Sequence, residues 1–205
     1  MHISVDDQII KKIKNFKSQK VFFVDDFIDM SNYKTVSKAL ERLVISGDLA
    51  RVAKGIYTRP KTDPILGTLL PTTEQLANAI AKRDKARIIP TGSFALYALG
   101  LSTQVPMNIV YLTDGSARTI KLGQRTIKFK KTSPKNLATK GKVSSLVIQA
   151  LKAIGKDKVT ESEQRKILEL LLKENPTDLE HDIRLAPEWI RKIMKEALTN
   201  DEKQK

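Results

Sequence analysis

The chain carries six basic side chains between residues 34 and 59: Lys34, Lys38, Arg42, Arg51, Lys54 and Arg59. The first three recur every four residues, a spacing that aligns side chains on one face of an α-helix. Arg51 and Arg59 lie on either side of the pair Lys54-Gly55, and such a pair is typical of a tight turn between two strands. Ammonium and guanidinium groups donate hydrogen bonds to phosphate oxygens and to base edges in the major groove. The spacing therefore predicts a helix and a hairpin that bind DNA.

Residues 31–60 hold the local signals for these two elements. An apolar stripe would pack the helix against a core: Val36, Ala39, Leu40, Leu43 and Val44. Gly47 ends the helix, and two short strands are predicted at 49–53 and 56–59, where Gly55 allows the positive φ of the turn. The polar first turn of the helix adds donors for base edges. We expect the DNA contacts to come from eleven residues: Ser31, Asn32, Tyr33, Lys34, Thr35, Ser37, Lys38, Arg42, Arg51, Lys54 and Arg59.

The segment before the helix completes a familiar order of elements. Ser4 and Asp7 form a capping-box pattern, and apolar residues at helical spacing predict a first helix over residues 4–17. A β-prone run follows at 21–24, and Asp25 caps a very short helix that ends at Met30. The order helix, strand, helix, helix, hairpin is that of a winged helix-turn-helix domain. We predict such a domain at residues 1–62.

The charged face of the helix has a second interpretation, namely a surface that is only solvated. The basic hairpin favours DNA binding, because donors for both base edges and phosphates would then lie together. Glu41 lies within the polar face and would repel phosphate. It would pair with Lys38 or Arg42, or accept a hydrogen bond from a cytosine amine, and the sequence leaves these alternatives open.

The net charge of +14 over 205 residues is unevenly distributed. Residues 1–62 carry 12 basic and 7 acidic side chains, residues 63–142 carry 13 and 4, and residues 143–205 carry 12 of each. The first two thirds hold all of the excess, which predicts a polyanionic partner. Double-stranded DNA fits better than a membrane, because no basic amphipathic helix combines with large aromatic anchors. We expect a monomer or a weak dimer on the DNA.

The residue types exclude several chemistries. Cysteine is absent, so disulfides, thiolate metal sites and cysteine nucleophiles are excluded. The two histidines are His2, at the terminus, and His181, which leaves one candidate general base and no multi-histidine metal site. We expect no metal and no cofactor. The N-terminus lacks an apolar signal core, and no apolar run reaches the roughly 18 residues that span a bilayer, so we expect a cytoplasmic protein.

A second domain is predicted at residues 63–205, after a boundary marked by Pro60 and Pro64. Helices are expected after Thr72 and at 94–99, and strands at 87–90, 108–112, 118–122 and 125–130. They predict a small, mainly antiparallel sheet flanked by helices, which makes the whole chain α+β. The C-terminal third is helical and charge-balanced. Its apolar stripes at 143–154, at 160–173 and from Pro187 onward, including Trp189, indicate core rather than a partner surface.

Residues 115–142 carry nine basic and no acidic side chains. We expect a second basic surface from six of them: Arg118, Lys121, Arg125, Lys128, Lys130 and Lys131. Alternation along 125–130 places Ile127 and Phe129 on one face of the strand, and Lys128 and Lys130 on the other. Two interpretations are open. Lysines at a sheet edge discourage strand pairing, and uncompensated cations bind the phosphates of DNA or RNA.

The hairpin and the segment after it combine several short motifs: Gly47, Lys54-Gly55-Ile56-Tyr57, Thr91-Gly92-Ser93, Gly100-Leu101-Ser102, and Pro106 before a strand that ends in Leu112-Thr113. In these motifs residues 20–140 resemble the AbiEi family of antitoxins from type IV toxin–antitoxin systems. Proteins of that family are bacterial and repress their own operon through a winged-helix domain, usually at inverted repeats. They counter a partner nucleotidyltransferase toxin through the C-terminal domain. The resemblance implies the same two partners for this chain, its own promoter and such a toxin.

An enzyme is one alternative, because nucleotidyltransferases hold a triphosphate at a Gly-Ser turn that starts a helix, as Gly92 and Ser93 would. Paired aspartates that bind magnesium would have to follow, and downstream only Asp114 is found, in a hairpin turn. We therefore expect no enzyme, with Gly92 making a tight turn and Ser93 capping a helix. A second alternative is a DNA-binding transcriptional regulator with no toxin partner, which an adjacent nucleotidyltransferase-like gene would argue against.

Overall fold

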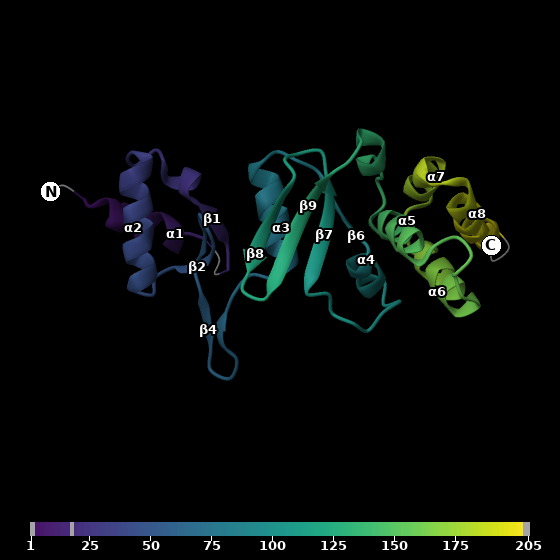
Figure 1. Ribbon diagram of the computed structural model, residues 1–205, viewed down its shortest axis with the longest axis horizontal. Helices are drawn as coiled ribbons and strands as arrows, with labels where there is room; N and C mark the ends of the chain where they lie inside the picture. The colour runs from purple at the N-terminus through teal and green to yellow at the C-terminus, as the bar shows by residue number, and fades with distance from the viewer. Residues whose placement is uncertain (1–2, 17–18, 203–205) are drawn as a thin grey trace. The chain divides into compact units, whose positions relative to one another are not determined.

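The computed structural model describes residues 3–16 and 19–202, with side chains up to Thr199. His2 and Lys17, the expected end of the first helix, lie outside the described residues. Helices and small sheets both occur, so the chain is of mixed α+β class (Figure 1). It divides into two compact units, Met1–Ile80 and Ala81–Lys205. None of the helices in the described residues combines the length and the apolar composition that crossing a lipid bilayer requires.

The first unit builds one core from two helices and a small sheet. Its helices are α1 (Val5–Lys14) and α2 (Tyr33–Ile45), and its sheet strands are β1 (Val21–Phe23), β2 (Ala50–Ala53) and β3 (Ile56–Thr58). β2 and β3 form a hairpin, and β1 pairs antiparallel with β3, which gives the order β1-β3-β2. The apolar stripes of both helices turn inward, where Ile9 and Leu40 are fully buried. The core therefore fixes α2 with its polar face outward.

The turn before α2 differs from the sequence prediction. The short helix expected up to Met30 is a single 3-10 turn, η1 (Val24–Phe27). Asp26 fixes its start, because the carboxylate accepts a hydrogen bond from the backbone N–H of Phe23 at 2.7 Å. Phe27 then packs into the core, and Met30 closes a separate turn by donating its N–H to the carbonyl of Phe27 at 3.0 Å. The segment is too short for a run of α-helical hydrogen bonds, which join residues four apart in the chain.

A second hairpin occupies the place of the expected domain boundary. It consists of β4 (Lys61–Asp63) and β5 (Gly67–Leu69), paired antiparallel. One carboxylate oxygen of Asp63 accepts hydrogen bonds from the backbone N–H groups of Ile65 and Leu66, each at 2.9 Å. Gly67 completes the turn at a φ of 71°, in the left-handed region that glycine tolerates best. Pro60 therefore precedes a defined hairpin and Pro64 lies in its turn, so this segment is not an extended linker.

Helix α3 (Thr73–Arg83) follows the second hairpin and spans the point at which the two units are divided. The helix expected after Thr72 is confirmed, and Thr72 caps it: the Thr72 hydroxyl accepts from the N–H of Gln75 at 3.1 Å, and the Gln75 side chain accepts from the N–H of Thr72 at 2.8 Å. This reciprocal pair is a capping box, which satisfies two N–H groups at the start of the helix.

The second unit contains a four-stranded sheet of order β6-β7-β9-β8. The strands are β6 (Ile88–Thr91), β7 (Asn108–Thr113), β8 (Arg118–Leu122) and β9 (Arg125–Lys131). β6 and β8 pair antiparallel with their neighbours, whereas β7 and β9 run parallel, so the sheet is mainly antiparallel as predicted. Tyr111 and Phe129 are buried on one face, with ring centroids 5.9 Å apart. Phe94 of α4 (Ser93–Ala98) lies 6.3 Å from Tyr111, so that α4 covers this face.

Four helices complete the second unit: α5 (Lys142–Ile154), α6 (Glu161–Leu171), α7 (Pro176–Leu185) and α8 (Glu188–Glu202), after a 3-10 turn η2 (Pro134–Leu137). The apolar spacing predicted α5, α6 and α8 but did not indicate α7. The apolar stripes meet in one core around the fully buried Leu151, Ile167 and Ile190, and Trp189 packs against it half-buried. The prediction that these stripes form core is therefore confirmed.

Candidate nucleic-acid interface

The exposed face of α2 begins at its N-terminal cap. The side-chain oxygen of Asn32 accepts a hydrogen bond from the backbone N–H of Thr35 at 3.0 Å, which starts the helix. Lys34, Lys38 and Glu41 then lie exposed on the side opposite the buried stripe. Because residues three and four apart are neighbours on a helix, these three side chains form one continuous strip.

Two of the six basic residues predicted to contact DNA form hydrogen bonds within the protein. The guanidinium of Arg42 donates two hydrogen bonds to the carboxylate of Asp6 on α1, at 2.8 and 2.6 Å. The hydrogen bond from Arg42 holds the pKa of Asp6 below its ordinary value. Arg59 donates to the carbonyls of Lys14 and Phe16, both at 3.3 Å, at the end of α1. Both arginines therefore tie α1 to the rest of the first unit.

The other four basic residues are Lys34, Lys38, Arg51 and Lys54. All four are exposed, and none has a hydrogen bond or ion pair to another residue in the described part of the chain. Glu41 is exposed as well, and no ion pair joins it to Lys38, while Arg42 is held by Asp6. The cations of α2 and of the β2–β3 hairpin are thus open to solvent and to an anionic partner.

The β2–β3 hairpin presents two of these cations. Arg51 lies directly opposite Tyr57 in the antiparallel register, and the register shifts between Arg51 and Ala53. Burial raises the pKa of the Tyr57 phenol, and the nearby charge of Arg51 opposes that change. Lys54 stands in the turn beside Gly55, whose φ is 71°. Directly opposite residues share one face of an antiparallel pair, and on that face Tyr57 is buried while the Arg51 side chain is exposed, which leaves Arg51 free to contact a phosphate.

The remaining residues predicted to contact DNA lie in and just before the first turns of α2. Tyr33 is 57% exposed, and Ser31, Thr35 and Ser37 are half-buried. The carbonyl oxygen of the Asn32 side chain is occupied by its capping hydrogen bond, which leaves the amide N–H₂ as a donor. These side chains therefore add hydrogen-bonding groups beside the exposed face of α2 that carries Lys34.

The second basic surface is divided between the two faces of the sheet. In the register of β8 and β9, Lys121 lies opposite Thr126 and Thr119 opposite Lys128. Strand alternation therefore places three exposed lysines on the face away from the aromatic core: Lys121, Lys128 and Lys130. On that face the side chains offer charge without an aromatic ring for stacking on a base.

The other three residues of that set alternate onto the face that holds the aromatic core. Arg118 is half-buried, pairs with Asp84, and its guanidinium carbon lies 5.5 Å from the Phe129 ring centroid. Burial lowers the pKa of Arg118. Arg125 and Lys131 are exposed at the two ends of β9. The structure thus places three of the six residues in one patch, and the other three lie outside that patch.

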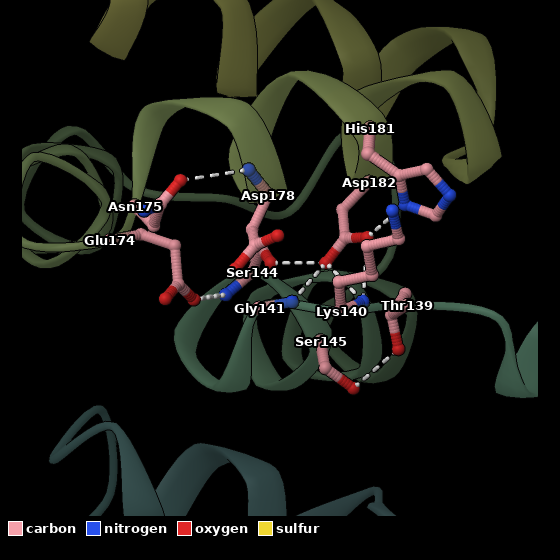
Figure 2. Close-up of polar contacts among 10 residues, drawn as sticks. All are labelled: Thr139, Lys140, Gly141, Ser144, Ser145, Glu174, Asn175, Asp178, His181 and Asp182. Carbon is pink, nitrogen blue, oxygen red and sulfur yellow. Dashed lines mark hydrogen bonds and ion pairs between the residues drawn. The ribbon is translucent and has the colours of Figure 1, made fainter.

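A buried polar cluster, which sequence reasoning missed, joins α5 and α7 (Figure 2). Asp182 is fully buried, and its carboxylate accepts from the backbone N–H groups of Lys140 and Gly141, each at 2.9 Å. The hydroxyl of Ser144 donates to the same carboxylate at 2.5 Å, and Nδ1 of His181 lies 2.8 Å from it. Since both side chains bind the carboxylate, Ser144 and His181 are not arranged as a nucleophile and its base.

The cluster serves the start of α5. Its N-cap residue is Gly141, which has no side chain to accept the free N–H groups of the first turn. Glu174 accepts from the N–H groups of Val143 and Ser144, at 2.7 and 3.0 Å, and thereby adds a second carboxylate at the same helix end. Glycine at an N-cap is the sequence signal for acceptors supplied from elsewhere, although it does not say from where.

The Gly-Ser turn considered for an enzyme lies at the start of α4. Gly92 has a φ of 64°, and Ser93 begins the helix, which places Gly92 and not Ser93 at the N-cap. Asp114 accepts hydrogen bonds from Arg87, from the backbone N–H at 2.8 Å and from the guanidinium at 2.9 Å. These bonds hold the pKa of Asp114 below its ordinary value. The carboxylate is thus occupied by an arginine of the neighbouring strand end.

Comparison with known proteins gives a family without a known activity. The search of curated proteins gives no match. One family profile matches residues 8–179 of the 205, which covers the first unit from within α1 onward and most of the second. The chain therefore belongs to this family, which is described as a family of unknown function (DUF6088).

Proposed function

We propose that the first unit is a winged helix-turn-helix domain that binds double-stranded DNA. The observation that carries this proposal is the set of four exposed and unpaired cations on α2 and on the β2–β3 hairpin: Lys34, Lys38, Arg51 and Lys54. In this proposal α2 enters the major groove with its N-terminal turn towards the base edges, and the hairpin contacts the adjacent backbone. Phosphate contacts from the lysines position the unit, and Asn32 and Tyr33 contact bases.

The biological setting that we propose is that of an autorepressing antitoxin. Its support is the resemblance of residues 20–140 to the AbiEi family, together with the excess positive charge of the first two thirds of the chain. The chain would repress its own promoter at inverted repeats and would counter a nucleotidyltransferase toxin through its second unit. A transcriptional regulator without a toxin shares every DNA-binding feature and is the second candidate.

The DNA step is tested by fluorescence anisotropy with a duplex from the region upstream of the chain's own reading frame. The test variant is Lys38→Ala with Arg51→Ala. The matched control is Lys11→Ala with Lys14→Ala, which removes the same charge from exposed positions of α1. Each lost phosphate contact reduces the slope of log K against log salt by about 0.9, so the test variant should lose nearly two units and the control none. Equal slopes for the two variants would refute the proposed interface.

The antitoxin step is tested by expressing the neighbouring gene alone and together with this chain. If the neighbour is a nucleotidyltransferase-like toxin, growth arrest should be relieved by co-expression, and the Lys38→Ala, Arg51→Ala variant should still relieve it. That result would separate toxin control from DNA binding. A non-toxic neighbour would favour the regulator, and a toxic neighbour that co-expression does not relieve would refute the antitoxin.

A further inference from the structure

The tip of the β4–β5 hairpin exposes two adjacent aliphatic side chains. Ile65 is 92% exposed and Leu66 is 72% exposed, and Pro64 beside them is exposed as well. The hairpin extends from the first unit beyond the β2–β3 strands (Figure 1). Three consecutive apolar residues therefore stand at the end of a narrow two-stranded ribbon.

The geometry of the turn does not require these residue types. The carboxylate of Asp63 accepts the backbone N–H groups of Ile65 and Leu66, and Gly67 supplies the left-handed conformation. Polar residues usually occupy such tips, because their side chains hydrogen-bond to backbone groups of the turn and to water. Here Asp63 and Gly67 already stabilise the turn, so the aliphatic side chains at the tip need another explanation.

The tip is small for a protein partner. Two aliphatic side chains offer on the order of 300 Å², whereas a standard protein–protein interface takes roughly 800 Å² from each partner. The two strands behind the tip expose Lys61, Thr62 and Thr68, and the one acidic group, Asp63, is occupied by the turn. Apolar residues at the end of a polar or basic ribbon match the pattern of proteins that wedge side chains between base pairs.

We propose that Ile65 and Leu66 insert between adjacent base pairs from the minor groove and bend the DNA to which the first unit binds. This inference rests on the proposed DNA binding. Lys61 and the two threonines contact the groove walls, and the aliphatic pair replaces part of the stacking that the step loses. Pyrimidine–purine steps unstack most easily, so the wedge acts at a TA or CA step.

The experiment uses the full chain and the same upstream duplex, labelled in two ways. 2-Aminopurine placed at successive TA and CA steps reports unstacking, and a donor and an acceptor dye at the two ends report bending. The test variant is Ile65→Ala with Leu66→Ala. The matched control is Ile3→Ala with Ile28→Ala, which removes two aliphatic side chains that are also more than half exposed in the first unit.

The natural chain should raise 2-aminopurine emission at one step and increase end-to-end energy transfer. The test variant should lose both signals while its affinity falls by about tenfold or less, because burying the side chains and unstacking the bases have opposite effects of similar size. Its salt slope should stay unchanged, since no phosphate contact is lost. The control should behave as the natural chain.

Three results would overturn the wedge. One is full binding by the natural chain without unstacking or bending, which leaves the proposed DNA binding intact. The second is unchanged bending by the test variant. The third is a shift of the test variant to a smaller species in sedimentation velocity without DNA, which would assign the tip to self-association. Absence of binding by the natural chain would instead refute the proposed function and the wedge with it.

Discussion

Replacing Asp182 by alanine should destabilise the second unit more than any exposed substitution in it. The carboxylate is fully buried and accepts from two backbone N–H groups and the hydroxyl of Ser144, and it lies 2.8 Å from Nδ1 of His181. Alanine leaves these donors without their acceptor. When a buried donor loses its acceptor, the free energy of unfolding falls by the desolvation free energy of that donor, whereas an exposed donor can bind water instead.

The size of the effect follows from which donors can reach water. Lys140 is exposed and His181 is half-buried, so both can be hydrated after the substitution. Gly141 and Ser144 are buried, and each unsatisfied donor there costs about 1–3 kcal/mol. The free energy of unfolding should therefore fall by about 3 kcal/mol, with the cap of α5 weakened at the same time.

Urea unfolding followed by the fluorescence of Trp189 measures this effect, because Trp189 is the only tryptophan and packs against the core of the second unit. With a urea dependence of about 2 kcal/mol per molar, the midpoint should fall by roughly 1.5 M. Glu180→Ala is the matched control, since Glu180 lies exposed on the same helix. A midpoint for Asp182→Ala equal to that of the control would refute the assignment of Asp182 as the acceptor that holds α5 and α7 together.

Two further substitutions test other contacts. Asp6→Asn should destabilise the first unit at pH 7; because Arg42 lowers the pKa of Asp6 in the folded state, this stabilisation is present above the ordinary value of 3.8 and is lost as the pH falls through the folded pKa. Amide exchange of α2 should show a larger difference between the natural chain and the variant at pH 7 than at pH 3, and a difference of equal size at both would contradict the ion pair. Gly141→Ala should destabilise the second unit by about 1–3 kcal/mol, because the added methyl group would stand 2.3 Å from the Ser144 hydroxyl and 2.5 Å from the Glu174 carboxylate. Trp189 fluorescence during urea unfolding measures it, and an unchanged midpoint would show that the cluster can move apart without cost.

Local signals predicted the elements that carry the candidate interface. The apolar spacing over residues 36–44 predicted α2, and the Lys54-Gly55 pair predicted the turn between β2 and β3, because each signal lies within a few residues of the structure that it specifies. The β4–β5 hairpin was missed since its turn depends on Asp63 and Gly67 around two aliphatic residues, a combination outside the common turn pairs. Its prolines indicated a domain boundary, whereas the hydrogen bonds that the Asp63 carboxylate accepts stabilise a hairpin there.

Contacts between distant residues could not be predicted in the same way. Asp182 lies about forty residues beyond the helix end that it caps, and α7, which carries it, has a weak apolar pattern over ten residues. The N-cap glycine of α5 indicates only that an acceptor is required. Which of the acidic side chains supplies it depends on how the helices pack, and no spacing in the sequence encodes that.

The same limit applies to the number of cations that the proposed DNA interface can offer. Helical spacing places Lys34, Lys38 and Arg42 on one face, but Asp6, 36 residues earlier in the chain, holds Arg42 through two hydrogen bonds. Breaking that pair to contact a phosphate exchanges one anionic partner for another and leaves a carboxylate beside the DNA. Arg59 would likewise have to leave the two carbonyls at the end of α1.

The salt dependence of the proposed DNA binding would distinguish four contacting cations from six. Six phosphate contacts would give the first unit a slope of about −5.4 per protomer, and the four unpaired cations give about −3.6. Single alanine variants separate the contributions, because each of the four unpaired cations should reduce the slope by about 0.9, whereas Arg42→Ala and Arg59→Ala should lower the stability of the first unit and leave the slope as it was. Slopes that fall equally for all six would show that DNA displaces the internal partners of both arginines.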